Sequence, residues 1–328
     1  MTCQLPFLKI NQKRLGSRTA FVRWIAGNGV LIRYNHGMKK ITVFTILLIG
    51  CLLAACVKAT PTPEPTVTPT PQPPTPTPLP LALRVNGEGV LLSDYEAELA
   101  RLVQAQTTLN QVTSPEEQKN LVLTNYVDQL LLTQAATQNG FSVDDATLQA
   151  RIDKLVTEKG GTDKLAAWQS AHGYTDESFR TALRREIMAV WQRDQIINAV
   201  PTTAEQIHAR QILVQDEANA MDAYQKLQDG MDFADLANVY DPTMGGDLGW
   251  FAQGTLTQPE VDAAAFALEE GQYSTVIKSA IGYHIIYVIE RDPQHTLSIY
   301  GRTILQKAAL AKWLADARSV STIEILVP

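Results

Sequence analysis

A proline- and threonine-rich run from Lys58 to Pro80 limits most strongly how this chain of 328 residues can fold. Ten of the 17 prolines lie within it, and proline lacks the backbone N–H that a helix or an inner strand needs. The run also has too few apolar side chains to pack a core. Proline-rich chains extend by about 3.1 Å per residue, so the run predicts an unfolded tether of up to roughly 70 Å. We therefore expect the folded part of the chain after Pro80.

A secretory signal precedes this tether. Met38, Lys39 and Lys40 give a basic start, residues 41–53 are an apolar run, and small residues then lead to Cys56. A transmembrane helix needs about 20 apolar residues, so this run is too short, and a buried helix that ends in cysteine is the alternative. The segment resembles a bacterial lipobox, which implies cleavage before Cys56 and attachment of lipid to that residue.

The expected processing divides the first 80 residues into two parts. Residues 1–55 would be removed as leader and signal peptide, and residues 56–80 would form the lipidated tether. Residues 1–37 contain no Asp or Glu and precede a natural start at Met38, so we interpret them as the product of a misplaced start codon. The resemblance implies an extracytoplasmic chain that is lipid-anchored to a bacterial membrane, on the outer face of the cell membrane or on the periplasmic side.

The chain after Cys56 is acidic, because all 34 Asp and Glu residues but only 20 of the 28 Lys and Arg residues lie there. Such a surface repels nucleic-acid phosphates, so no nucleic-acid partner is expected. The other cysteines, Cys3 and Cys51, belong to the leader. The mature chain is therefore expected to have no disulfide, no zinc–thiolate site and no cysteine nucleophile, and no motif indicates a metal or a cofactor.

Residues 81–205 are predicted to form a helical domain. Ser and Glu at residues 93–96 and again at 114–117 have the spacing of capping boxes that open helices. The Asn-Gly pair at 139–140 is a typical helix end. The expected elements are a strand at 83–86 and helices at 93–109, 114–139, 144–159, 163–171 and 176–198.

Residues 206–293 are predicted to form a compact α+β domain, because the apolar pattern becomes strand-like from Ile207. Residues 294–328 contain a helix and a strand that fit the helical domain better than the α+β domain. The fold class is therefore α+β. In this half we expect helices at 217–229, 232–239, 259–268 and 301–317, a glycine-rich loop at 245–254, and strands from 207, at 283–289 and at 322–327.

Five short blocks stand out in the α+β domain, whereas no phosphate-binding loop, Ser-His-Asp set, metal spacing or carboxylate pair does. In order and spacing the blocks resemble the parvulin (PpiC-like) family of peptidyl-prolyl cis/trans isomerases. The helical domain, with its Val-Asn-Gly-Glu start at 85–88, resembles the N-terminal domain of SurA-type periplasmic chaperones and PrsA-type lipoprotein foldases. The blocks are ARQILV at 209–214, DFADLA at 232–237, GGDLGWF at 245–251, AAFAL at 264–268 and GYHII at 282–286.

These resemblances imply a small antiparallel sheet in the α+β domain and a definite activity. The chain would be a membrane-anchored isomerase and foldase whose partners are unfolded or newly exported polypeptides with X-Pro bonds. Prolyl isomerisation breaks no bond but crosses the partial double-bond barrier of the amide. An apolar slot for the proline ring and well-placed polar groups suffice for this reaction, and no cofactor is required.

In parvulins the polar groups are two histidines, a hydroxyl residue and an acid or cysteine. The resemblance maps the second histidine to His284, the hydroxyl to Ser279 and the acid to Asp241, which lies in a shortened loop. Gln211 stands in place of the first histidine; its amide can donate and accept hydrogen bonds but cannot carry the proton. His208 should face the other side of its strand. A core histidine with no catalytic role is the alternative for His284.

The family's proline pocket maps to Leu248, Leu256 and Val261. Valine replaces a phenylalanine ring that packs on the substrate proline, so we expect a shallower pocket. Together with the missing first histidine, this change leaves a second interpretation open: a non-catalytic holdase chaperone that binds unfolded exported polypeptides through a degenerate parvulin domain. Trp250 and Phe251, which follow the glycine turn, are expected to pack in the core.

Overall fold

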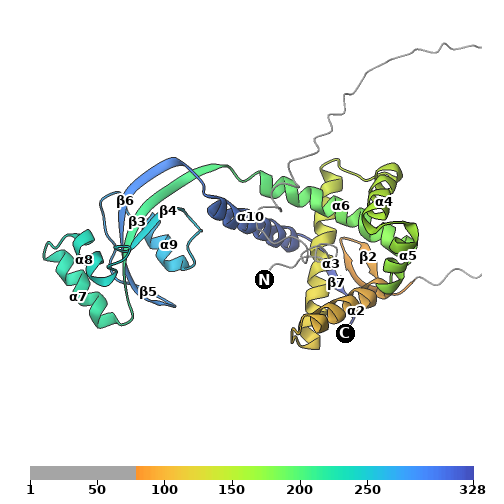
Figure 1. The fold of residues 1–328 in the computed structure, drawn as a ribbon, viewed down its shortest axis with the longest axis horizontal. Helices are drawn as coiled ribbons and strands as arrows, with labels where there is room; N and C mark the ends of the chain where they lie inside the picture. Colours follow the sequence, from red (N-terminus) through yellow and green to blue (C-terminus); the bar gives the residue numbers. More distant parts are fainter. Residues whose placement is uncertain (1–78) are drawn as a thin grey trace, which may run out of the picture. The chain divides into compact units, whose positions relative to one another are not determined.

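The computed structural model describes residues 79–328. The expected leader, the lipidated Cys56 and nearly all of the tether lie outside these residues. The described chain contains two antiparallel sheets, one of three strands and one of four, each with its own set of helices (Figure 1).

The three-stranded sheet joins the two ends of the described chain. Its order is β2-β1-β7, with β1 at Leu81–Val85, β2 at Glu88–Leu91 and β7 at Ile323–Ile325. Asn86 and Gly87 form the β1–β2 turn with φ angles of 51° and 87°, and an Asn-Gly pair adopts this left-handed conformation at little cost. The last strand of the described residues thus pairs with the first.

Within the described residues, six helices belong with this sheet. α3 and α6 pack against each other, and α10, from the C-terminal part of the chain, contacts both (Figure 1). The helices are α2 (Leu92–Thr108), α3 (Pro115–Gln138), α4 (Asp145–Lys159), α5 (Thr162–Ala171), α6 (Asp176–Asn198) and α10 (Ile299–Ser319).

The core beneath the sheet includes residues from both ends of the chain. Leu83 and Leu130 are fully buried, and Trp313 of α10 and Ile323 of β7 pack against the same cluster. The C-terminal helix and strand therefore complete the helical part, which confirms the predicted fold class. The domain boundaries expected at 205/206 and 293/294 stay predictions.

The two predicted capping boxes have different outcomes. At α3 the Ser114 hydroxyl accepts from the Glu117 N–H and the Glu117 carboxylate accepts from the Ser114 N–H, so the capping box is confirmed. At α2 the prediction was wrong: the cap residue is Leu91, which makes no side-chain cap, and Ser93 lies inside the first turn. Strand β2 runs directly into α2, so no loop residue lies between them whose side chain could cap the helix.

The four-stranded sheet has the order β4-β3-β6-β5. The long strands β3 (Thr203–Val214) and β6 (Gly282–Thr296) pair at its centre, and β4 (Asp247–Ala252) and β5 (Ile277–Ser279) form the edges. The prediction of a loop throughout 245–254 was wrong, because residues 247–252 pair with β3 despite Gly249 within them and the Gly245-Gly246 pair before them.

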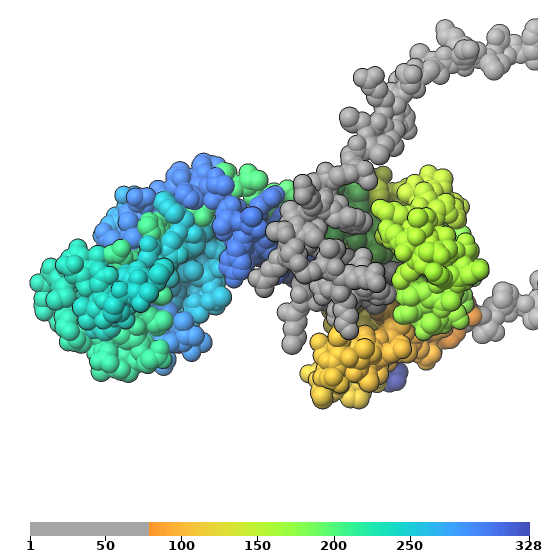
Figure 2. All heavy atoms as spheres, viewed as in Figure 1, coloured from red at the N-terminus to blue at the C-terminus, as the bar shows by residue number. Residues whose placement is uncertain are grey.

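Helices cover both faces of this sheet (Figure 1). α7 (Glu217–Gln228) and α8 (Phe233–Tyr240) pack on the face that carries Ile212 and Ile285, whereas α9 (Pro259–Phe266) packs on the face that carries Ile207 and Ile286. Figure 2 draws all heavy atoms of this part as spheres, and they form a continuous surface where Figure 1 shows separate ribbons. Each face of the sheet therefore has its own apolar cluster.

None of the helices within residues 79–328 is long and apolar enough to cross a membrane.

Candidate active site

His284 lies on the face of the four-stranded sheet that α9 covers. Successive residues of a strand point to opposite faces, so Gln211 of β3 shares this face with Ile207, and His284 of β6 shares it with Ile286. The His284 residue is 1% exposed. The register, which pairs Leu213 with His284, places Gln211 and His284 close together on adjacent strands.

The His284 ring makes a hydrogen bond at each nitrogen. Nδ1 lies 3.0 Å from Oε1 of Gln211, and Nε2 lies 2.7 Å from Oγ of Ser279. The Gln211 oxygen can only accept, so Nδ1 of the neutral ring carries the proton and donates to it. Nε2 therefore accepts from the Ser279 hydroxyl, whose oxygen in turn accepts from the Ile281 N–H at 3.1 Å. Three of the expected site residues are thus joined in one uncharged network.

The charge state of His284 follows from its surroundings. Burial lowers the pKa of the His284 imidazole below its usual value of 6.5, because desolvation disfavours the charged ring, while the carboxylate of Glu260 acts in the opposite direction. The imidazole is therefore neutral at pH 7. A neutral ring suits a reaction that needs oriented hydrogen bonds rather than proton transfer.

The three residues expected in the proline pocket also come together. Leu248 and Leu256 are partly buried and pack against the apolar cluster that contains Val261 on α9, which is 2% exposed. Ile277 belongs to the same cluster and pairs with His284 across β5 and β6, so the cluster adjoins the hydrogen-bond network. The sheet face thus carries an apolar cluster beside oriented polar groups.

Asp241 lies at the end of α8 and bonds to the backbone of its own loop. Its carboxylate accepts from the N–H groups of Thr243, Met244 and Gly246, at 3.2, 3.1 and 3.2 Å. These bonds, chiefly those from Met244 and Gly246, lower the pKa of the Asp241 carboxyl. The Gly246 carbonyl in turn accepts from the Gln211 N–H at 2.8 Å. Asp241 therefore reaches the network through backbone, and the catalytic role expected for it stays a prediction.

His208 faces the opposite side of β3 from Gln211. Its Nε2 lies 2.9 Å from the Asp247 carboxylate, and its ring stacks near Trp250, which also stacks on His295 with ring centroids 4.2 Å apart. Trp250 is only half-buried, so the expectation that it packs in the core was wrong, whereas Phe251 is buried as expected. Trp250 does pack against neighbouring rings, but these are themselves only partly buried.

Sequence reasoning missed Asp262, the residue after Val261. Its carboxylate is buried on α9 and accepts from the N–H groups of Gly254 and Leu256. An acidic residue inside the apolar stretch VDAAAFAL is the signal that would have found it, because a carboxylate is rarely buried without partners.

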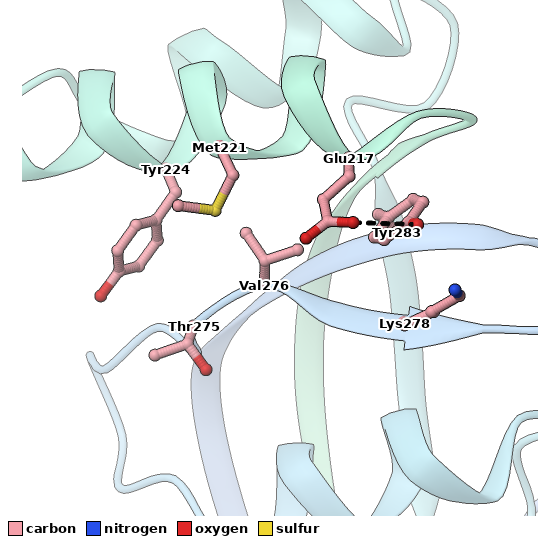
Figure 3. A pocket seen from close by; sticks show the side chains of 7 residues that line it. All are labelled: Glu217, Met221, Tyr224, Thr275, Val276, Lys278 and Tyr283. Carbon is pink, nitrogen blue, oxygen red and sulfur yellow. Dashed lines mark hydrogen bonds between the residues drawn. The ribbon is translucent and has the colours of Figure 1, made fainter.

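A hollow lies on the face of the four-stranded sheet opposite to the candidate site, between α7 and the β5–β6 hairpin (Figure 3). Its volume is about 340 Å³, and the Tyr283 hydroxyl donates to Glu217 at one end. None of the expected site residues lines it. The lining residues are Glu217, Met221, Tyr224, Thr275, Val276, Lys278 and Tyr283. No group of acidic, histidine and cysteine side chains within residues 79–328 is arranged to hold a metal ion.

An apolar cluster beside a neutral histidine, glutamine and serine network, on one face of a four-stranded antiparallel sheet, defines a parvulin-type prolyl isomerase domain. The rotamase family, described as the PPIC-type PPIASE domain, matches residues 195–290, and the SurA-like N-terminal domain matches residues 38–191. The chain therefore carries a PpiC-type peptidyl-prolyl isomerase domain and a SurA-like N-terminal domain.

Named relatives agree with this assignment. Foldase protein PrsA of Caldanaerobacter subterraneus subsp. tengcongensis is 33% identical over 51% of this chain and 56% of its own length. Chaperone SurA of Methylobacillus flagellatus is 30% identical over 52% of this chain and 47% of its own length. The chain thus spans about half the length of these two curated relatives.

Solved structures are also similar. The parvulin of Nitrosopumilus maritimus is 32% identical, with 26% of this chain and 98% of that chain covered and a TM-score of 0.24. The Bacillus cereus PrsA crystal structure is 24% identical, with 70% of this chain and 84% of that chain covered and a TM-score of 0.41.

Proposed function

We propose that the protein catalyses cis/trans isomerisation of X-Pro bonds in newly exported polypeptides and thereby assists their folding outside the cytoplasm. The observation that carries this proposal is the joining of His284, Gln211 and Ser279 in one neutral network beside the apolar cluster of Leu248, Leu256 and Val261. Relatives named foldase and chaperone support the same proposal.

The mechanism follows from the arrangement of the site. The apolar cluster holds the proline ring and removes water from its amide, and a desolvated amide loses part of the resonance that resists rotation. The network then supports the twisted amide with fixed dipoles that need no reorganisation during the reaction. Bringing the uncatalysed time of tens to hundreds of seconds below one second requires about 3 kcal/mol of transition-state stabilisation. A few hydrogen bonds with fixed geometry can supply this amount.

A holdase chaperone without turnover is the second candidate function. Val261 favours it, because this short side chain is 2% exposed and offers little surface to a proline ring. The helical part would then carry most of the binding to unfolded polypeptides, and the parvulin domain would hold extended segments without rotating their X-Pro bonds.

One pair of assays separates the two functions. The purified protein at micromolar concentration is expected to speed the cis/trans relaxation of a short X-Pro peptide and the proline-limited refolding of a model protein. A holdase would instead suppress aggregation of a proline-free client and leave both rates unchanged. Serum albumin at equal mass serves as the control for nonspecific effects on refolding. Unchanged rates in both isomerisation assays would contradict the enzyme proposal.

The proposed location is the extracytoplasmic surface of a bacterial membrane, reached through lipid on Cys56. The basic and apolar run that ends in Leu53-Ala54-Ala55-Cys56 supports this anchor. Cells that express the chain and are fed a radioactive fatty acid are expected to label it and to retain it in the membrane fraction. The Cys56→Ser variant should lose both the label and the membrane retention, whereas Cys51→Ser, five residues earlier, should keep both. Equal labelling of all three chains would refute lipid attachment at Cys56.

A further inference from the structure

Asp262 stands out because a carboxylate is buried in the apolar face that forms the candidate pocket. The residue is 4% exposed and lies in the first turn of α9, next to Val261. Both of its oxygens lie 2.9 Å from the Gly254 nitrogen, and Oδ2 lies 3.2 Å from the Leu256 nitrogen. An ionised carboxylate is costly to bury unless such donors compensate it. These bonds therefore explain how the charge is accommodated.

The same bonds join the two elements that carry Leu256 and Val261, two of the three residues of the expected proline pocket. Leu256 lies on the loop after β4, and Val261 lies on α9, so the two side chains come from different elements. The loop begins with a turn in which Thr255 bonds back to the Ala252 carbonyl through its N–H and its hydroxyl. That turn fixes the start of the loop, whereas the Asp262 carboxylate fixes the distance from Leu256 to the helix that carries Val261.

We propose that Asp262 is the positioning residue of the proline pocket: its carboxylate holds the Leu256 backbone against α9 and so sets the width of the apolar slot. This inference rests on the proposed function, because the slot is taken to bind the proline of a polypeptide. Asp262 acts through Leu256 and does not touch the substrate. Its effect must therefore disappear when the Leu256 side chain is absent.

A double-mutant cycle on the full chain tests this dependence. Asp262→Asn keeps the size of the side chain, but its amide nitrogen can no longer accept from a backbone N–H. With an X-Pro peptide as substrate, we expect KM to rise about fivefold to tenfold while kcat stays within a factor of two. In a Leu256→Ala background the same substitution should change KM less than twofold. Asp262→Glu, which retains the carboxylate, should recover part of the lost affinity.

Asp232→Asn is the matched control, since the Asp232 carboxylate also accepts from two backbone N–H groups, at the start of α8 and away from the pocket. It should leave KM unchanged. An equal rise in KM with and without Leu256, or a fall in kcat alone, would overturn the positioning role. So would a lowered melting temperature with unchanged KM, which would make Asp262 a structural cap only.

The peptide Kd, measured by titration, keeps this test distinct from that of the proposed function. If the protein binds the X-Pro peptide without isomerising it, the enzyme proposal fails. The double-mutant cycle is then evaluated from the peptide Kd, for which we expect the same fold-changes as for KM. If it neither binds nor isomerises the peptide, both proposals are overturned.

Discussion

Replacing His284 with alanine is expected to lower kcat/KM for an X-Pro peptide roughly tenfold to a hundredfold, which corresponds to about 1.4 to 2.7 kcal/mol of lost transition-state stabilisation. The substitution removes the ring that joins Gln211 to Ser279. Both neighbours would keep their places on β3 and β5, but their polar groups would lose the partner that fixes their direction. The measurement is the relaxation rate of the peptide at several enzyme concentrations.

The pH dependence of the unchanged protein belongs to the same prediction. The His284 pKa is lowered below 6.5, so the active neutral ring persists as pH falls through the range in which an exposed histidine becomes charged. Activity should stay level from pH 8 to 6.5 and fall only in more acidic solution. Because the folded pKa lies below the unfolded value, His284 stabilises the fold fully above pH 6.5, and this contribution is lost as pH falls from 6.5 through the folded pKa.

His295→Ala provides the matched control for His284→Ala. His295 is also on β6, but it stacks on Trp250 and pairs with Asp292 instead of joining the network. Its removal should leave kcat/KM and the acid limb of the pH profile unchanged. Full activity of His284→Ala would reduce His284 to a core histidine, and an activity loss centred at pH 6.5 or above would contradict the neutral network.

The sequence predicted helices better than it predicted the edges of sheets. The Ser114-Pro115 start of α3 was found correctly, because a capping box and an N-terminal proline act within one turn and need no tertiary contact. Strand β4 was missed, because Gly249 within it and the Gly245-Gly246 pair before it indicate a loop when read alone. Only pairing with β3 makes residues 247–252 a strand, and that pairing joins segments more than 35 residues apart.

At the candidate site, too, the sequence predicted some features and missed others. Resemblance to the parvulins identified His284, Gln211 and Ser279, and the structure joins all three. The resemblance did not reveal which nitrogen of the His284 ring faces which partner, since this depends on strand register. Asp262 was missed because an acid in the first turn of a helix is ordinarily explained by the helix dipole. Its burial against the 254–256 loop is a tertiary property that no local pattern encodes.

Gly246→Ala is expected to lower the free energy of unfolding by about 3 kcal/mol or more and to disrupt the candidate site together with the fold. Gly246 has a φ of 70°, and a Cβ added to it would lie 1.9 Å from the carbonyl oxygen of Gln211. This neighbour is backbone in the centre of the sheet and cannot move aside as the end of a side chain can. Alanine at position 246 must therefore either break the hydrogen bond from the Gln211 N–H to its carbonyl or displace β3.

Gly249→Ala is the control that separates the effect of this close contact from the effect of backbone strain. The φ of 66° at Gly249 is nearly the same, but an added Cβ there would meet nothing within 4 Å. Gly249→Ala should therefore cost only the strain of a left-handed alanine, about 1 to 2 kcal/mol in urea unfolding at pH 7, and should retain peptide binding. Gly246→Ala should cost more and lose binding as well. Equal costs would mean that conformational freedom alone explains the Gly-Gly pair; a larger cost at Gly246 would mean that close packing of this glycine on β3 holds Gln211 in place beside His284.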